Sequence, residues 1–167
     1  MIFYLIDPIT VNIPRHPLRI NVGFLLNAPI GYSRDIHFDY PQVRLEDEYF
    51  TRFTGVVRVN RTPQGILVQS EFLAFHVVEC VRCLEEFAQE LHCEFSELYA
   101  FNRRSTTESN LVLREDGNID LESLAREYLL IEIPISPLCR PDCLGLCPEC
   151  GQNLNLEICE HSVRVTD

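Results

Sequence analysis

A chain of 167 residues is long enough for one domain, or for one domain with a small appendage. Its apolar fraction of 46% and its ten Phe residues are sufficient to build a hydrophobic core. The formal net charge of −11 argues against diffuse binding to phosphates, because such binding needs Lys and Arg to replace counterions. This charge suits a basic protein partner better.

The N-terminus, Met1 to Ile6, is apolar but ends at Asp7 and Pro8. It has no basic region, and the apolar stretch is too short for a signal peptide or a membrane span. We therefore expect a cytoplasmic protein with no membrane contact. In a reducing cytosol, clustered cysteines indicate metal ligands rather than disulfides.

Most of the chain up to residue 100 is predicted to form strands separated by turns. The expected strands cover residues 18–26, 36–40, 43–45, 53–60, 66–80 and 87–95. Residues 61–65 predict a hairpin turn, and the polar residues 103–110 predict a mobile loop. In the run 66–80, five apolar residues share one face of the predicted strand by period two: Ile66, Val68, Phe72, Ala74 and Val78. Cys93 lies between Leu91 and Phe95 in the same alternation, which predicts a core residue rather than a ligand.

A single main helix is predicted at about 121–133. Asp120 is its expected N-cap, its apolar residues recur at helical spacing, and Pro134 ends it. The predicted fold is therefore α+β, with an antiparallel, barrel-like β-sheet and one main helix. We expect residues 1–138 to form this β-rich domain, and residues 139–167 to form a cysteine-rich, zinc-binding tail packed on it.

Metal binding is the chemistry that the cysteines indicate most strongly. Two CxxC pairs far apart in a sequence are a strong metal signal, and a structural zinc ion takes four sulfur or nitrogen ligands. The candidate ligands are Cys80, Cys83, Cys139, Cys143, Cys147, Cys150, Cys159 and His161. Eight candidates allow one zinc site with residues to spare, or two complete sites.

Three groupings of these ligands are open. The preferred one joins the two CxxC pairs, Cys80 and Cys83 with Cys147 and Cys150. The second is local to the tail and uses Cys139, Cys143, Cys147 and Cys150. The third uses Cys147, Cys150, Cys159 and His161. The alternative to all three is a set of reduced thiols that fill small apolar gaps.

Catalysis has little support in this sequence. The chain has no Gly-rich phosphate loop and none of the common hydrolase motifs, and its other histidines are dispersed. A zinc ion with four protein ligands has no open position for water. A thiol redox protein is a further alternative, but such chemistry needs a cysteine exposed at the N-terminus of a helix, and Cys80 instead ends a predicted strand.

The residues that carry these motifs resemble the YceD family, which is named for accumulation of large-subunit ribosomal RNA. The resemblance rests on residues 80–87 (CVRCLEEF), the helix after Asp120, the pair Ile133-Pro134, and residues 139–155 (CRPDCLGLCPECGQNLN). It extends from about Phe53 to His161. Some relatives lack cysteine pairs, which implies that metal stabilises this branch and is not the shared activity. Many relatives end in Cys-x-Cys, where this chain has His161.

The resemblance implies a non-enzymatic factor in the synthesis, processing or accumulation of large-subunit ribosomal RNA. It implies large-subunit components as partners, and we expect no small-molecule substrate. The acidic composition favours a basic ribosomal protein over naked rRNA. The alternative is a direct RNA-binding protein with a local basic patch, for which the candidates are Arg58, Arg61, Arg103 and Arg104.

Overall fold

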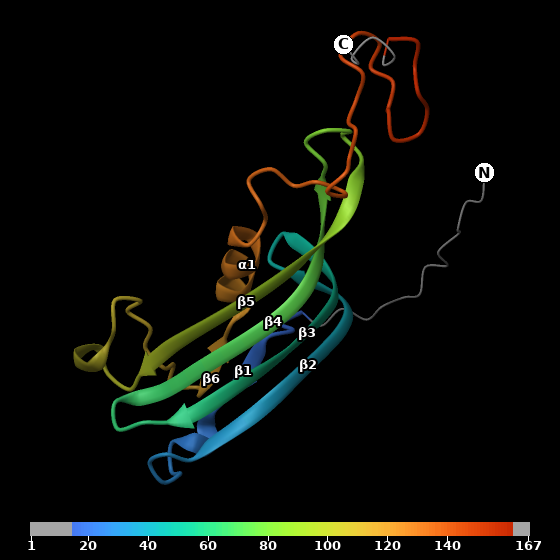
Figure 1. Cartoon of the computed structure of the whole chain (residues 1–167). Coiled ribbons are helices and arrows are strands. Elements are labelled where there is room, and N and C mark those ends of the chain that lie inside the picture. The colour runs from blue at the N-terminus through green and yellow to red at the C-terminus, as the bar shows by residue number, and fades with distance from the viewer. Residues whose placement is uncertain (1–14, 162–167) are drawn as a thin grey trace.

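The computed structural model describes residues 15–161. The predicted apolar segment Met1–Ile6 lies outside these residues. So do the start of the predicted region 1–138 and the end of the predicted region 139–167. Four long antiparallel strands form the main sheet, in the order β2-β3-β4-β5 (Figure 1). Their bounds are Ser33–Leu45 for β2, Glu48–Arg61 for β3, Gly65–Glu79 for β4 and Glu86–Ala100 for β5.

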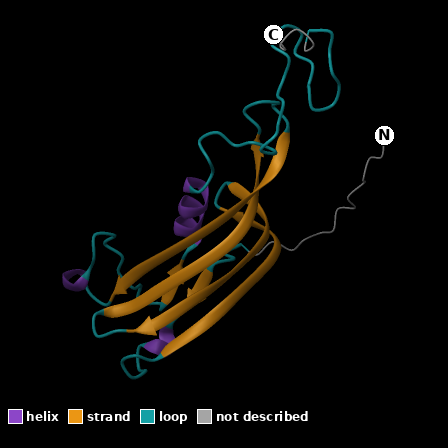
Figure 2. Cartoon of the chain, in the orientation of Figure 1, coloured by secondary structure: helices purple, strands orange, loops and turns teal. Residues whose placement is uncertain are grey.

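Short elements complete the described part of the chain (Figure 2). Strands β1 (Arg19–Asn21) and β6 (Asn118–Asp120) pair with each other in a separate two-stranded sheet. Two 3-10 turns cover Gly23–Leu25 and Arg103–Ser105, and the α-helix α1 covers Glu122–Ile131. Among residues 15–161, α1 is the only α-helix, in agreement with the prediction of one main helix.

One hydrophobic core lies between the main sheet and the elements packed on its inner face. Side chains from β4 and β5 alternate into this core, as the period-two pattern predicts: Ile66, Val68, Phe72, Ala74, Leu91, Cys93 and Phe95 are buried. Helix α1 packs on β5, where the ring of Tyr128 stacks on Phe95 at a centroid distance of 4.8 Å. The prediction that Cys93 is a core residue is confirmed, and burial raises the pKa of its thiol to about 12.

The prediction of a barrel-like sheet is wrong, because the sheet is open. Strand β2 pairs with β3 and strand β5 pairs with β4, so both remain edge strands among the described residues. The inner face is instead covered by α1 and by the β1–β6 pair, which share its core. The edge position of β2 also explains why this strand can contain Pro41. Proline has no N–H to donate to a neighbouring strand, and an edge strand tolerates it because one of its sides has no neighbour.

Several predicted boundaries change. Residues 36–40 and 43–45 belong to one continuous strand, whereas only Arg19–Asn21 of the predicted strand 18–26 is extended. The loop predicted over 103–110 begins with a 3-10 turn. Helix α1 is shorter than 121–133. Its N-cap is Leu121, one residue after the predicted Asp120, although the Asp120 carboxylate does accept from the N–H of Glu122 at 3.0 Å.

Candidate metal centre

The first cysteine pair lies in the turn that joins β4 to β5, which we call the inner Cys turn (residues 80–85). Cys80 donates its N–H to the carbonyl oxygen of Glu85 at 2.9 Å, and Leu84 donates back to the carbonyl of Cys80 at 2.9 Å. Leu84, directly after Cys83, has a left-handed backbone with φ of 59°. This tight turn directs both sulfurs to one point.

The second pair lies in the tail and repeats the same turn; we call residues 147–152 the outer Cys turn. Cys147 donates to the carbonyl of Gln152 at 2.8 Å, and Gly151 donates to the carbonyl of Cys147 at 2.8 Å. Gly151 has a φ of 74° at the position that Leu84 occupies in the inner turn. The two CxxC pairs are therefore two copies of one hydrogen-bonded turn, each with a left-handed residue after its second cysteine.

The inner Cys turn faces two cysteines of the tail. We call Cys80, Cys83, Cys139 and Cys143 the inner cluster, because their four sulfurs lie within 4.8 Å of one another. The sulfurs of Cys80 and Cys143 are 3.8 Å apart, and those of Cys83 and Cys139 are 3.7 Å apart. These distances are too long for a disulfide. They match the edge of about 3.8 Å that a tetrahedral zinc site has when each Zn–S bond is about 2.3 Å.

Hydrogen-bond donors around the inner cluster favour thiolates, which are the form that binds metal. Burial opposes ionisation of Cys80, but N–H groups of Cys139, Cys83 and Arg82 lower the pKa of its thiol to about 6. Burial also opposes ionisation of Cys143, yet the Asn155 amide, with its nitrogen 3.3 Å from the sulfur, helps to lower that pKa. In contrast, burial and the neighbouring sulfurs raise the pKa of Cys139 to about 12. A cation that binds here must therefore displace protons from part of the cluster.

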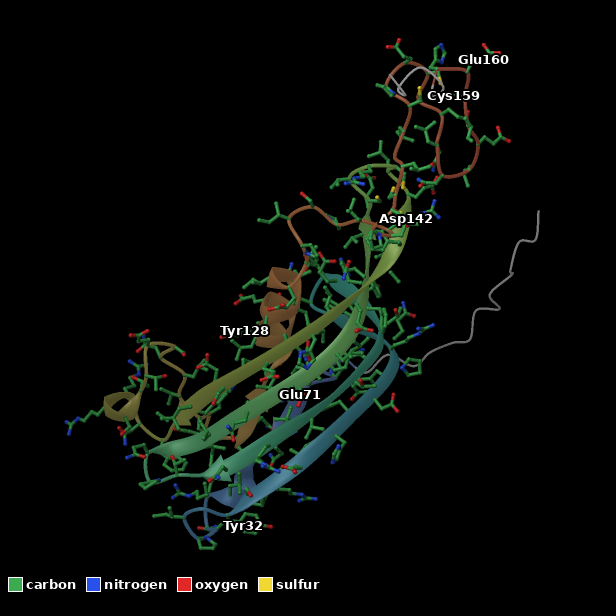
Figure 3. The ribbon with its side chains drawn as sticks, in the orientation of Figure 1. Tyr32, Glu71, Tyr128, Asp142, Cys159 and Glu160 are labelled. Carbon is green, nitrogen blue, oxygen red and sulfur yellow. The ribbon has the colours of Figure 1, made fainter. Side chains whose placement is uncertain are left out.

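The other four candidates form the outer cluster at the tip of the tail. The ligand atoms of Cys147, Cys150, Cys159 and His161 also lie within 4.8 Å of one another. Cys150 and His161 are exposed, whereas three of the four inner cysteines are buried. Figure 3 labels Cys159 at this tip, far from the middle of the main sheet.

The path of the tail explains this division. Val81 of the inner turn donates its N–H to the carbonyl of Pro137 at 3.0 Å, and Leu146 donates to the carbonyl of Arg82 at 3.0 Å. The Arg82 guanidinium donates to the carbonyl of Cys143 at 2.9 Å. These bonds place residues 137–146 directly on the inner turn, so the outer turn lies beyond it.

All eight predicted ligands are thus found in two sets of four. The preferred grouping of Cys80 and Cys83 with Cys147 and Cys150 does not occur in the structure, and neither does the grouping local to residues 139–150. The third predicted grouping is the one that forms the outer cluster. Sequence reasoning missed the role of Asn155, although the Asn153-Leu154-Asn155 segment was part of the resemblance.

The two alternative functions fit this geometry less well. The lowered pKa of Cys80 is a property of reactive thiols, but this side chain is fully buried, and a redox cysteine must be accessible. Of the predicted basic patch, Arg58 is held by Asp35 through bonds of 2.7 and 2.8 Å. Arg61 stacks on Phe101 at 4.2 Å from the ring centroid, while Arg103 and Arg104 are exposed.

Comparison with known proteins agrees with the resemblance. The family described as "Large ribosomal RNA subunit accumulation protein YceD" matches residues 74–167, which include both clusters. The chain belongs to the YceD family.

Several curated proteins are similar to this YceD chain. Proteins of Mycobacterium tuberculosis and Mycobacterium bovis, each described as uncharacterized, are 40% identical over 105 residues. These residues are 60% of this chain and 51% of each relative, so the chain spans about half the length of the curated relatives it matches. A chloroplastic maize protein, "Large ribosomal RNA subunit accumulation protein YCED homolog 1", is 42% identical over 40 residues, 24% of this chain and 14% of its own length. No solved structure matches the chain.

The match places the YceD-like part of this chain on β4, β5, α1 and the tail, since it begins at residue 74 within β4. The inner cluster connects the ends of this part, the β4–β5 hairpin and the tail. Among the described residues, no helix is long and apolar enough to cross a membrane.

Proposed function

We propose that this YceD protein is a non-enzymatic, cytoplasmic factor that assists the synthesis, processing or accumulation of large-subunit ribosomal RNA during ribosome assembly. The observation that carries the proposal is the family match over residues 74–167, since the family is named for this accumulation. The name of the maize relative supports the same role.

Each cluster holds one structural zinc ion in this proposal. The S–S distances of the inner cluster fit a tetrahedral site, and four protein ligands leave no position for a reacting water. The inner ion would fix the tail to the β4–β5 hairpin, and the outer ion would fold the tip. Elemental analysis of protein purified without chelator should find two zinc ions per chain. Zinc far below one ion per chain, with all thiols intact, would contradict this assignment.

A basic large-subunit protein is the proposed direct partner, because the net charge of −11 repels phosphate over most of the surface. Labelled fragments of large-subunit ribosomal RNA should bind weakly to the isolated protein at physiological salt, and more tightly once basic large-subunit proteins are added. Tight, sequence-selective binding of RNA by the protein alone would contradict a partner-mediated role.

The role itself is tested in cells. Deletion of the gene should lower mature large-subunit ribosomal RNA relative to small-subunit RNA, and should reduce free large subunits in a sucrose gradient. The wild-type gene should restore the ratio. An unchanged ratio in the deletion strain would overturn the proposed role, whatever metal the protein holds.

Direct binding of RNA is the second candidate, favoured only by the exposed pair Arg103 and Arg104. Removing phosphate contacts reduces the dependence of affinity on salt, by about 0.7 in log–log slope for each contact with single-stranded RNA. If this pair binds RNA, the affinity of the Arg103→Ala/Arg104→Ala variant should therefore depend less steeply on salt concentration than that of the parent. Arg58→Ala is the matched control, because Arg58 is already neutralised by Asp35.

A further inference from the structure

The outer face of the main sheet is not covered by any segment among residues 15–161, and we call it the open face. Strands alternate their side chains between the two faces, so each of the four long strands contributes to it. Two adjoining shallow hollows of about 560 and 570 Å³ lie on this face, and both are lined by Val56 of β3 and Glu71 of β4. Figure 3 shows Glu71 in the middle of the sheet.

The open face is acidic. The two hollows are lined by four carboxylates and a single guanidinium: Asp35, Asp39, Glu71, Glu94 and Arg58. Arg58 and Asp35 neutralise each other through their two hydrogen bonds. The remaining carboxylates give the face its charge, and two histidines, His37 and His92, accompany them.

Two of these carboxylates destabilise the pairing of the strands that carry them. Glu71 and Glu94 are direct partners in the β4–β5 register, and like charges in opposite positions destabilise a strand pair. His92 lies 3.2 Å from Glu71 but is also exposed. Charges on edge strands can serve to prevent edge-to-edge pairing. That explanation does not apply to Glu71, because β4 is an inner strand.

We propose that the open face binds a lysine- or arginine-rich segment of a basic protein, an inference that rests on the proposed function because that function provides the basic partner. The cations of such a segment would lie between Glu71, Glu94 and Asp39. The methylene groups of its lysine and arginine side chains would cover Val56 and Leu73, which are half-buried apolar residues between the carboxylates.

The charge of the face disfavours two other occupants. RNA phosphates would meet carboxylates, which raises the free energy of binding. Residues 1–14 of this chain contain no Lys or Arg, so this segment cannot neutralise the face.

Binding of a fluorescent oligolysine peptide to the whole 167-residue chain tests the inference. The measurement is fluorescence anisotropy at about 0.15 M ionic strength, where charges more than about 8 Å apart are largely screened. The test variant is Glu71→Gln/Glu94→Gln. The control is Glu108→Gln/Glu115→Gln, which removes the same charge from exposed residues outside the two hollows.

The test variant should lose affinity about tenfold, whereas the control should stay within about twofold of the parent. Circular dichroism should show that both variants are folded. Equal losses in the two variants would mean diffuse attraction and would overturn the inference, as would an absence of binding by the parent. Binding of labelled oligouridine RNA that depends on Glu71 and Glu94 would assign the face to RNA and overturn it too.

The cellular assay separates this inference from the proposed function. If deletion leaves the ratio of the two ribosomal RNAs unchanged while oligolysine binds the open face, the function fails and the inference stands. If deletion lowers the ratio and the Glu71→Gln/Glu94→Gln gene restores it fully, the function stands and the inference fails.

Discussion

Loss of the inner Cys turn should destabilise the whole domain, whereas loss of the outer Cys turn should not. The matched variants are Cys80→Ser/Cys83→Ser and Cys147→Ser/Cys150→Ser, each of which removes both sulfurs of one turn. Each should reduce bound zinc from two ions to one. The difference lies in what each ion would connect: an inner ion would join the β4–β5 hairpin to the tail, and an outer ion would join residues of the tail alone.

The size of the effect follows from the loops that the ions close. In the unfolded chain an inner ion must close the 56-residue separation between Cys83 and Cys139, which costs about 4 kcal/mol in the chain-entropy description of a crosslink. In the folded chain that loop is already closed. An inner ion that also bound the unfolded chain would therefore stabilise the fold by about 4 kcal/mol. Cys150 and Cys159 are only nine positions apart, for which the cost is about 2.5 kcal/mol.

Thermal unfolding followed by far-UV circular dichroism measures the difference. A loss of about 4 kcal/mol should lower the Tm of the inner variant by about 8–16 °C. The outer variant should keep the Tm of the parent, because the hydrogen bonds of the main sheet do not involve residues 147–161. Equal falls in Tm for the two variants, or an inner variant that retains two zinc ions, would refute this reasoning.

The remaining predictions concern single residues. Cys93→Ala should leave the zinc content unchanged and cost about 1 kcal/mol in core packing, measured by urea unfolding. The pKa of the Cys93 thiol is about 12 in the folded protein, above its value of about 8.5 in an unfolded chain. The contribution of this thiol to the free energy of unfolding is therefore complete below pH 8.5 and is lost as pH rises towards 12. Unfolding curves from pH 8 to 11 should accordingly depend less on pH in Cys93→Ala than in the parent. Leu84→Gly should stabilise the fold by about 0.5–1 kcal/mol, because an exposed non-glycine residue with φ of 59° is strained; a lower Tm would contradict this. Gly151→Ala should cost about 1 kcal/mol for the same reason, although no atom lies within 4 Å of the added Cβ, and competition with a chelator should show the loss at one of the two ions only.

Alternation in the sequence predicted the long strands well because each strand has one covered face. Val68, Phe72 and Ala74 lie an even number of positions apart, which places them on one face of β4, and all three are fully buried. Closure of the sheet could not be predicted in this way. It depends on whether β2 and β5 pair, and these strands lie far apart in the chain, so no local pattern records their relation.

The cysteine spacing predicted which side chains gather into clusters but not all of their grouping. A CxxC pair is a local signal, because its two sulfurs converge through the bonds of a single turn. The choice of partner for the inner turn depends instead on the docking of the tail, through the bonds of Val81 to Pro137 and of Leu146 to Arg82. These are backbone bonds between distant residues, to which side-chain identity contributes little. The outer grouping was among the predictions because its ligands are close in sequence.

The separation of the inner ligands also determines when the site is completed during translation. Cys80 and Cys83 leave the ribosome before Cys139, which is 56 residues behind Cys83. At about 5–20 residues per second, this interval lasts about 3–11 s. For that time the nascent hairpin can offer only half of a zinc site, with two thiols that no tail covers. A newly made chain therefore depends on synthesis of residues 139–146 to cover the first cysteine pair, and a chain truncated before Cys139 would leave these two thiols uncovered.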